Sequence, residues 1–90
     1  MTVQRYVDNL LERAVAQMLT AQEKFPQPNY VLLKVAEEAG EVVQAGVHLA
    51  EGRDFTKDDL DAEIIDLIAM ALRLAVEGDQ INGVPPKTFE

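Results

Sequence analysis

The segment "DAEIIDLIAMALRLAVEG", residues 61 to 78, is apolar on nearly every side when it is drawn as a helix. At about 100° per residue, the polar strip of this helix covers about 80° and leaves about 280° to apolar side chains. The strip contains Asp59, Glu63, Asp66, Met70, Arg73 and Glu77. Two other helices of a 90-residue chain can hardly cover so wide an apolar surface. The pattern therefore predicts that a second copy covers the remainder, in a homodimer or homotetramer.

Apolar spacing, prolines and capping residues divide the rest of the chain. Apolar residues recur at helical intervals over residues 2–24, and Pro26 and Pro28 end that segment. A second helix is predicted over residues 29–51, with Asn29 as its N-cap and Gly52 just beyond its end.

A third helix is predicted over residues 57–77, because Thr56 and Asp59 form a capping box and Gly78 follows its last turn. The tail over residues 79–90 contains Asn-Gly and Pro-Pro, which predict a turn followed by an extended end. No segment alternates like a strand. We therefore predict one all-α domain over residues 1–90, whose three helices form a four-helix-bundle-like core that oligomerisation completes.

The net charge and the absence of cysteine limit the binding partners and the metal sites that this chain can have. A formal net charge of −8 makes nucleic acid and anionic membranes poor partners. The absence of cysteine excludes disulfides and thiolate metal sites, and the single histidine excludes multi-histidine centres. No stretch approaches the roughly 20 apolar residues of a membrane span. We expect a soluble, cytoplasmic protein.

The segment "KVAEEAGEVV", residues 34 to 43, places Glu37, Glu38 and Glu41 in one helix. Lys34, Gln44 and His48 share their arc, and the opposite arc is apolar or small. Such a layout is typical of an amphipathic helix whose charged face is solvated, and by itself it favours that interpretation. Glu37 and Glu41 stand four residues apart, and such like-charged pairs destabilise a helix by about 0.2–0.5 kcal/mol.

The acids of the third helix favour a site instead. Glu63 and Asp66 lie on a helix that should be largely buried, where a carboxylate is costly unless it is paired or binds a metal. They are spaced three residues apart, as are Glu38 and Glu41, so an antiparallel pairing of the two helices could bring all four together. An all-oxygen cage suits Mg²⁺, with Mn²⁺ as an alternative. The competing interpretation is an ion pair with Arg73 or with basic residues of the first helix.

These residues resemble a known family, the MazG-type all-α nucleoside triphosphate pyrophosphohydrolases. The family pattern is Glu-Glu-x-x-Glu on one helix and Glu-x-x-Asp on the next, and here it reads "EEAGE" at 37 to 41 and "EIID" at 63 to 66. The resemblance extends from about Lys34 to Glu77. It implies an oligomeric Mg²⁺-dependent hydrolase that cuts a nucleoside triphosphate into the monophosphate and pyrophosphate, for housekeeping of the nucleotide pool.

By position, the resemblance implies roles for seven side chains. It implies Glu37 as a catalytic residue that orients or deprotonates water or binds an additional ion. Lys34 would contact phosphate, unless it forms an ion pair with Glu38, and Arg73 would do so unless it pairs with Glu77. Many family members carry asparagine near the Arg73 position and a further basic helix, which this sequence lacks. The implied metal ligands are Glu38, Glu41, Glu63 and Asp66.

Two alternatives to this function stay open. One is phosphoribosyl-ATP pyrophosphohydrolase, which has a related helical core. The other is a non-catalytic helical dimer that acts as an interaction module, with solvated acids or a structural ion. Gly40 and Gly46 each cost about 0.8–1 kcal/mol relative to alanine in a helix interior, which indicates close backbone packing around them.

Overall fold

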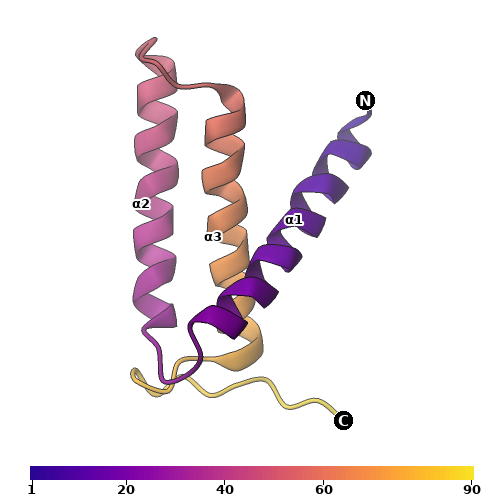
Figure 1. The fold of residues 1–90 in the computed structure, drawn as a ribbon, viewed down its shortest axis with the longest axis vertical. Coiled ribbons are helices and arrows are strands. Elements are labelled where there is room, and N and C mark those ends of the chain that lie inside the picture. The colour runs from indigo at the N-terminus through magenta and orange to yellow at the C-terminus, as the bar shows by residue number, and fades with distance from the viewer.

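The computed structural model describes residues 1–90 and consists of three helices without any strand (Figure 1). They are α1 (Val3–Lys24), α2 (Val31–Ala50) and α3 (Lys57–Glu77). The all-α prediction is confirmed, and each helix begins and ends within two residues of its predicted bounds. None of the three helices combines the length and the apolar character that a membrane crossing requires.

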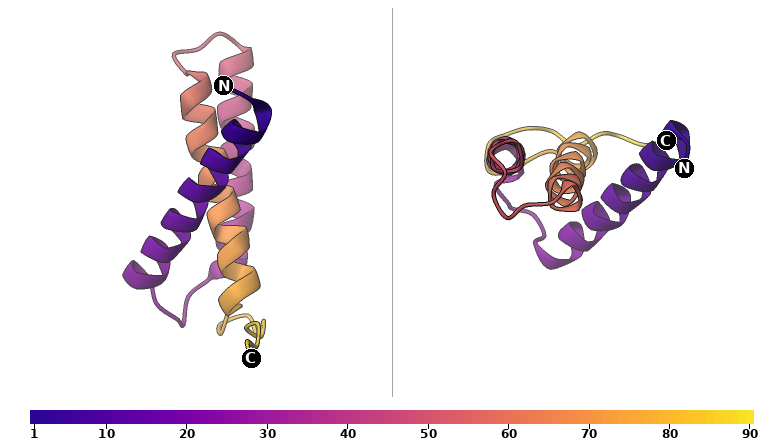
Figure 2. Two further views of the ribbon diagram at one scale, coloured as in Figure 1. Left: turned by 90° about the vertical axis from the view of Figure 1, so that its right-hand side faces the viewer. Right: turned by 90° about the horizontal axis from the view of Figure 1, so that it is seen from above.

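Helix α3 lies between the other two helices. Helices α2 and α3 run side by side and antiparallel, whereas α1 crosses α3 obliquely and its N-terminus points away from the pair (Figures 1 and 2). Both α1 and α2 pack on α3, and they do not pack on each other. The core is accordingly a thin layer along α3, in which Ala21, Ala69 and Met70 contact Met18 and Val35.

The sequence predicted uncovered apolar surface on the third helix, for a second copy to cover, and this stays a prediction. Although α1 and α2 pack on α3 from two sides, most of its large apolar side chains are only partly buried, among them Ile64, Leu67, Ile68 and Leu72. The exposed large apolar side chains of the helices are found on α1 and α2, with Val3 81% and Val43 65% exposed. Only 11 of the 90 residues are buried, which is a small core for an isolated chain.

Helix α2 buries parts of both its apolar and its acidic arc: Val31 and Ala45 are buried against the rest of the molecule. Glu38 and Glu41 are partly buried on the side toward α3, while Val43 and Val47 are exposed on the far side. The solvated-face interpretation of these two glutamates is therefore wrong. A buried carboxylate oxygen without a partner is unfavourable, and so is a large exposed apolar side chain. Each of these two features of α2 therefore needs an explanation.

The ends of the helices mostly follow the expected capping chemistry. The capping box at α3 is present: Thr56 Oγ1 accepts a hydrogen bond from Asp59 N, and Asp59 Oδ2 accepts one from Thr56 N. Gly78 ends α3 with a φ of 66°, and a Cβ there would lie 2.2 Å from the backbone oxygen of Val84. Only glycine fits this position.

The N-terminus of α2 departs from the prediction. Asn29 does not cap the helix, because Tyr30 occupies the N-cap position. The Tyr30 side chain makes no capping hydrogen bond. Asp79 from the tail takes that role, and its Oδ2 accepts a hydrogen bond from Leu32 N at 2.8 Å. Asp79 is fully buried and also accepts two bonds from Asn82. A residue 47 positions away therefore caps this helix.

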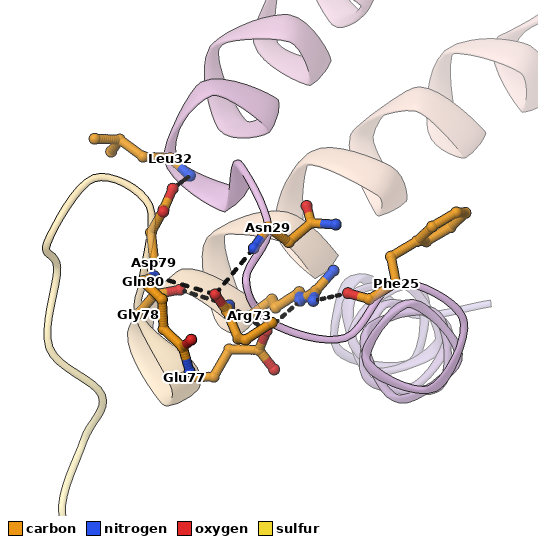
Figure 3. A network of polar contacts seen from close by, with 9 residues as sticks. Phe25, Asn29, Leu32, Arg73, Glu77, Gly78, Asp79 and Gln80 are labelled. Carbon is orange, nitrogen blue, oxygen red and sulfur yellow. Dashed lines mark hydrogen bonds and ion pairs between the residues drawn. The ribbon is translucent and has the colours of Figure 1, made fainter.

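A buried polar network joins the loop between α1 and α2 to the end of α3 (Figure 3). At its centre, the fully buried Arg73 donates from Nε to Glu77 Oε1 at 2.6 Å and from Nη2 to the Phe25 carbonyl. Gln27 donates to Glu77 Oε1 at 2.7 Å and accepts from the backbone N–H of Gln80. Together with Lys87 N, which donates to Val76 O, these bonds hold the tail against the helices.

Candidate metal centre

The two acidic motifs face each other across α2 and α3. Because the helices are antiparallel, a step of three residues along α2 matches a step of three back along α3. Glu38 and Asp66 line one pocket, and Glu41 and Glu63 line the next. The predicted encounter of "EEAGE" with "EIID" is therefore present in the structure.

Three of the four predicted ligands meet closely. Carboxylate oxygens of Glu38, Glu41 and Glu63 all lie within 4.8 Å of one another. Asp66 lies outside this set, but its charge acts on both Glu38 and Glu63. The sequence predicted an equivalent group of four, whereas the structure brings together three acids with the fourth beside them.

The chemistry of this cluster fits a hard cation. Glu38 Oε2 and Glu63 Oε2 are buried and have no hydrogen-bond partner. No lysine or arginine forms an ion pair with any of the four acids. Buried carboxylate oxygens that lack both partners and counter-charges are costly, and a bound divalent cation would satisfy them. Oxygen ligands alone favour hard divalent cations over softer ions.

Crowding shifts the protonation of the cluster. Desolvation and the neighbouring charge of Glu41 raise the pKa of Glu38 to about 7. Desolvation, with Glu41 again contributing, raises the pKa of Glu63 and of Asp66. Without a cation, the cluster therefore retains protons at pH values where isolated carboxyls are ionised, and a metal ion must displace them.

We expect the stability of the metal-free protein to fall as the pH rises from about 4.5 to about 7. The pKa of Glu38 is about 7 in the folded protein against an ordinary value of 4.5, so the folded state binds more protons in this window. The free energy of unfolding should be largest at the lower end and decline through pH 7. Urea unfolding at a series of pH values in EDTA measures this slope.

Saturating Mg²⁺ is the control for that pH series, because it should flatten the slope and raise the stability above pH 7. Asp61 and Asp79 do not interfere, because their pKa values are lowered below the ordinary 3.8 and act at more acidic pH. Stability that rises steadily between pH 4.5 and 7 in EDTA would contradict the arrangement of the three glutamates.

A pocket of about 310 Å³ opens beside the cluster. It lies where α1 and α2 flank α3, and it contains Lys34 near Glu37, Glu38 and Asp66. The Lys34 ammonium lies 4.6 Å from the centroid of the Phe25 ring and forms no ion pair with Glu38. The structure thus places the Lys34 ammonium and the exposed carboxylate of Glu37 at the rim of the acidic cluster.

Arg73 lies elsewhere. Its guanidinium is fully buried in the network of Figure 3, and the ion pair with Glu77 that the sequence left open is present. Contact with a phosphate would require this network to open.

His48 packs edge to face on Phe55, with ring centroids 5.6 Å apart, and lines the second pocket with Glu41 and Glu63.

No motif in the sequence indicates that α1 contributes to the pocket. Gln17, Ala21 and Phe25 form one wall, although none of them belongs to a motif. Their regular spacing of four residues indicates a helix face but not its function. Comparison of the chain with known protein families, with curated proteins and with solved structures found no match.

Proposed function

We propose that the protein is a Mg²⁺-dependent nucleoside triphosphate pyrophosphohydrolase, which releases a nucleoside monophosphate and pyrophosphate. The observation that carries this proposal is the meeting of Glu38, Glu41 and Glu63 with two buried, unpartnered carboxylate oxygens among them. The adjoining pocket supports it, because Lys34 lines this pocket together with Glu38 of the acidic cluster. A triphosphate with its cations matches that combination of charges.

Each side chain has a definable part in the reaction. Glu38, Glu41 and Glu63, with Asp66 beside them, would hold the cation, which when bound neutralises phosphate charge and acidifies a water. Lys34 would bind phosphate oxygens from the pocket wall. Glu37 would accept the proton of the water as its oxygen bonds to the α-phosphorus, while the bond from that phosphorus to the leaving pyrophosphate breaks.

The test is pyrophosphate release from a panel of ribo- and deoxyribonucleoside triphosphates, with Mg²⁺, Mn²⁺ or EDTA. We expect release that depends on the metal. Replacing Glu37 by glutamine should slow it by about 100-fold or more, the usual contribution of a general base, without lowering the thermal midpoint. The matched control is Glu12→Gln, which changes an exposed glutamate of α1 and should have no effect.

The same assay distinguishes the alternatives. Release from phosphoribosyl-ATP and from no simple triphosphate would assign the related histidine-pathway chemistry instead. No release from any substrate by folded protein in Mg²⁺ or Mn²⁺ would overturn the hydrolase and leave the non-catalytic dimer.

A further inference from the structure

The side of α2 that faces away from α3 carries a continuous apolar stripe. All of its residues are exposed, with Leu33 58%, Val43 65% and Val47 47% accessible. They alternate at spacings of three and four residues, the pattern of a helix seam that packs against another helix. This outer α2 face consists of Leu33, Ala36, Gly40, Val43, Val47 and Ala50.

We propose that the outer α2 face binds the same face of a second copy, with the two α2 helices antiparallel. In that order each large side chain meets a small one: Leu33 meets Ala50 of the other copy. One layer inward, Val47 meets Ala36. Next to the two-fold axis, Val43 meets Gly40. The helices then keep a nearly constant separation along their contact, and both copies use the same patch, as in an isologous interface.

A parallel pair would not fit as well. Each residue would then meet its own copy, so a wide layer at Leu33 would be followed by a narrow one at Gly40. Because packed helices keep a nearly constant separation, such layers would leave gaps. The size pattern of the outer α2 face is thus complementary to itself only when the helix is reversed.

Gly40 gives independent support. A glycine in a helix interior costs about 0.8–1 kcal/mol relative to alanine, and in the single chain nothing requires it. A Cβ built at Gly40 meets no atom within 4 Å. A second helix whose Val43 approaches this backbone explains why the position has no side chain.

The charges permit this contact despite the net charge of −8. The outer α2 face carries no charged residue, since Glu38 and Glu41 point to the opposite side of the helix. At its edge, the antiparallel order sets Glu37 beside Gln44 of the second copy, an amide that can donate a hydrogen bond to it. The interface does not depend on catalysis.

Sedimentation equilibrium over a range of protein concentrations tests the proposal. We expect a dimer that Val43→Glu weakens at least about 100-fold, because the introduced charge would be buried against apolar groups. The matched control is Val15→Glu on α1, where the valine is also exposed, at 43%. Circular dichroism checks that both variants stay helical, and Val47→Glu provides a second probe of the same face.

A second variant separates this interface from non-specific adhesion. Gly40→Leu adds apolar surface and should strengthen non-specific hydrophobic association. It should weaken the proposed dimer, because the two helices can then no longer approach closely. A monomer at every concentration, or equal weakening by Val15→Glu, would overturn the proposal and leave the face to a different protein.

Single cysteines test the orientation, because the chain has none of its own. In the antiparallel dimer, Ala36→Cys should form a disulfide with Val47→Cys when the two variants are mixed. Neither should cross-link with itself, since copies of one position lie about 16 Å apart along the helix axis, beyond the reach of a disulfide. Self-linking of Ala36→Cys would overturn the antiparallel order.

Discussion

Replacing Glu38 by glutamine is expected to lower pyrophosphate release by at least about 100-fold while making the metal-free protein more stable. Even partners outside the ligand shell change metal affinity or activity by about 10–100-fold, and Glu38 belongs to the three acids that meet within 4.8 Å. An amide of the same shape removes one negative charge beside Glu41 and needs no proton to stay neutral. Activity and stability should therefore change in opposite directions.

Three measurements on the same samples examine this result. Steady-state pyrophosphate release gives the loss of turnover, and thermal unfolding in EDTA gives the gain in stability. Thermal unfolding against Mg²⁺ concentration should show a rising midpoint for the wild type and little change for Glu38→Gln. Glu12→Gln should behave as wild type in all three. Unchanged activity in Glu38→Gln would exclude this carboxylate from the reaction, and a less stable metal-free variant would contradict the crowding of the acids.

Replacing Glu77 by alanine is expected to lower the free energy of unfolding by about 3–5 kcal/mol, the usual cost of removing one partner from a buried ion pair. The substitution leaves the Arg73 guanidinium charged and fully buried, with Nη1 already lacking a partner. It also removes an acceptor of the Gln27 amide. Small domains have only about 5–15 kcal/mol of stability in total, so this loss would be a large share of it.

Urea unfolding followed by circular dichroism measures this loss. The matched control is Glu51→Ala, which breaks the exposed pair with Arg53 and should cost less than about 1 kcal/mol. The double variant Arg73→Met with Glu77→Leu removes both charges and should recover at least half of the loss, since apolar replacements of buried pairs are often neutral. If Glu77→Ala costs no more than Glu51→Ala, the network of Figure 3 does not hold the end of α3.

Local patterns predicted the helices and the meeting of the acids. The capping box at Thr56 and the glycine at Gly78 depend on residues a few positions apart, so the sequence displays them directly. The shared spacing of three residues in the two acidic motifs likewise fixes which side chains face each other once α2 and α3 are antiparallel. These features needed no knowledge of the remaining chain.

Other features depend on contacts between distant segments. A helical wheel shows that α2 has a charged side and an apolar side, but it does not say how far each side is buried. In the structure Val31 and Ala45 are buried, and Glu38 and Glu41 are partly buried as well. The burial of Arg73 depends on the Phe25 carbonyl, which lies 48 positions earlier in the chain. Likewise, the cap of α2 comes from Asp79 and not from the adjacent Asn29.

The capping of α2 by Asp79 also bears on the order in which the protein is made. Synthesis proceeds from the N-terminus, so the first turn of α2 emerges from the ribosome long before the residue that accepts the Leu32 N–H. Until residue 79 has been synthesised, that amide has no side-chain acceptor. The glutamates of α2 likewise have no partner helix until α3 has been synthesised. The α2 half of the acidic cluster therefore exists before its α3 half, and Glu38, Glu41 and Glu63 can meet only after α3 has been translated.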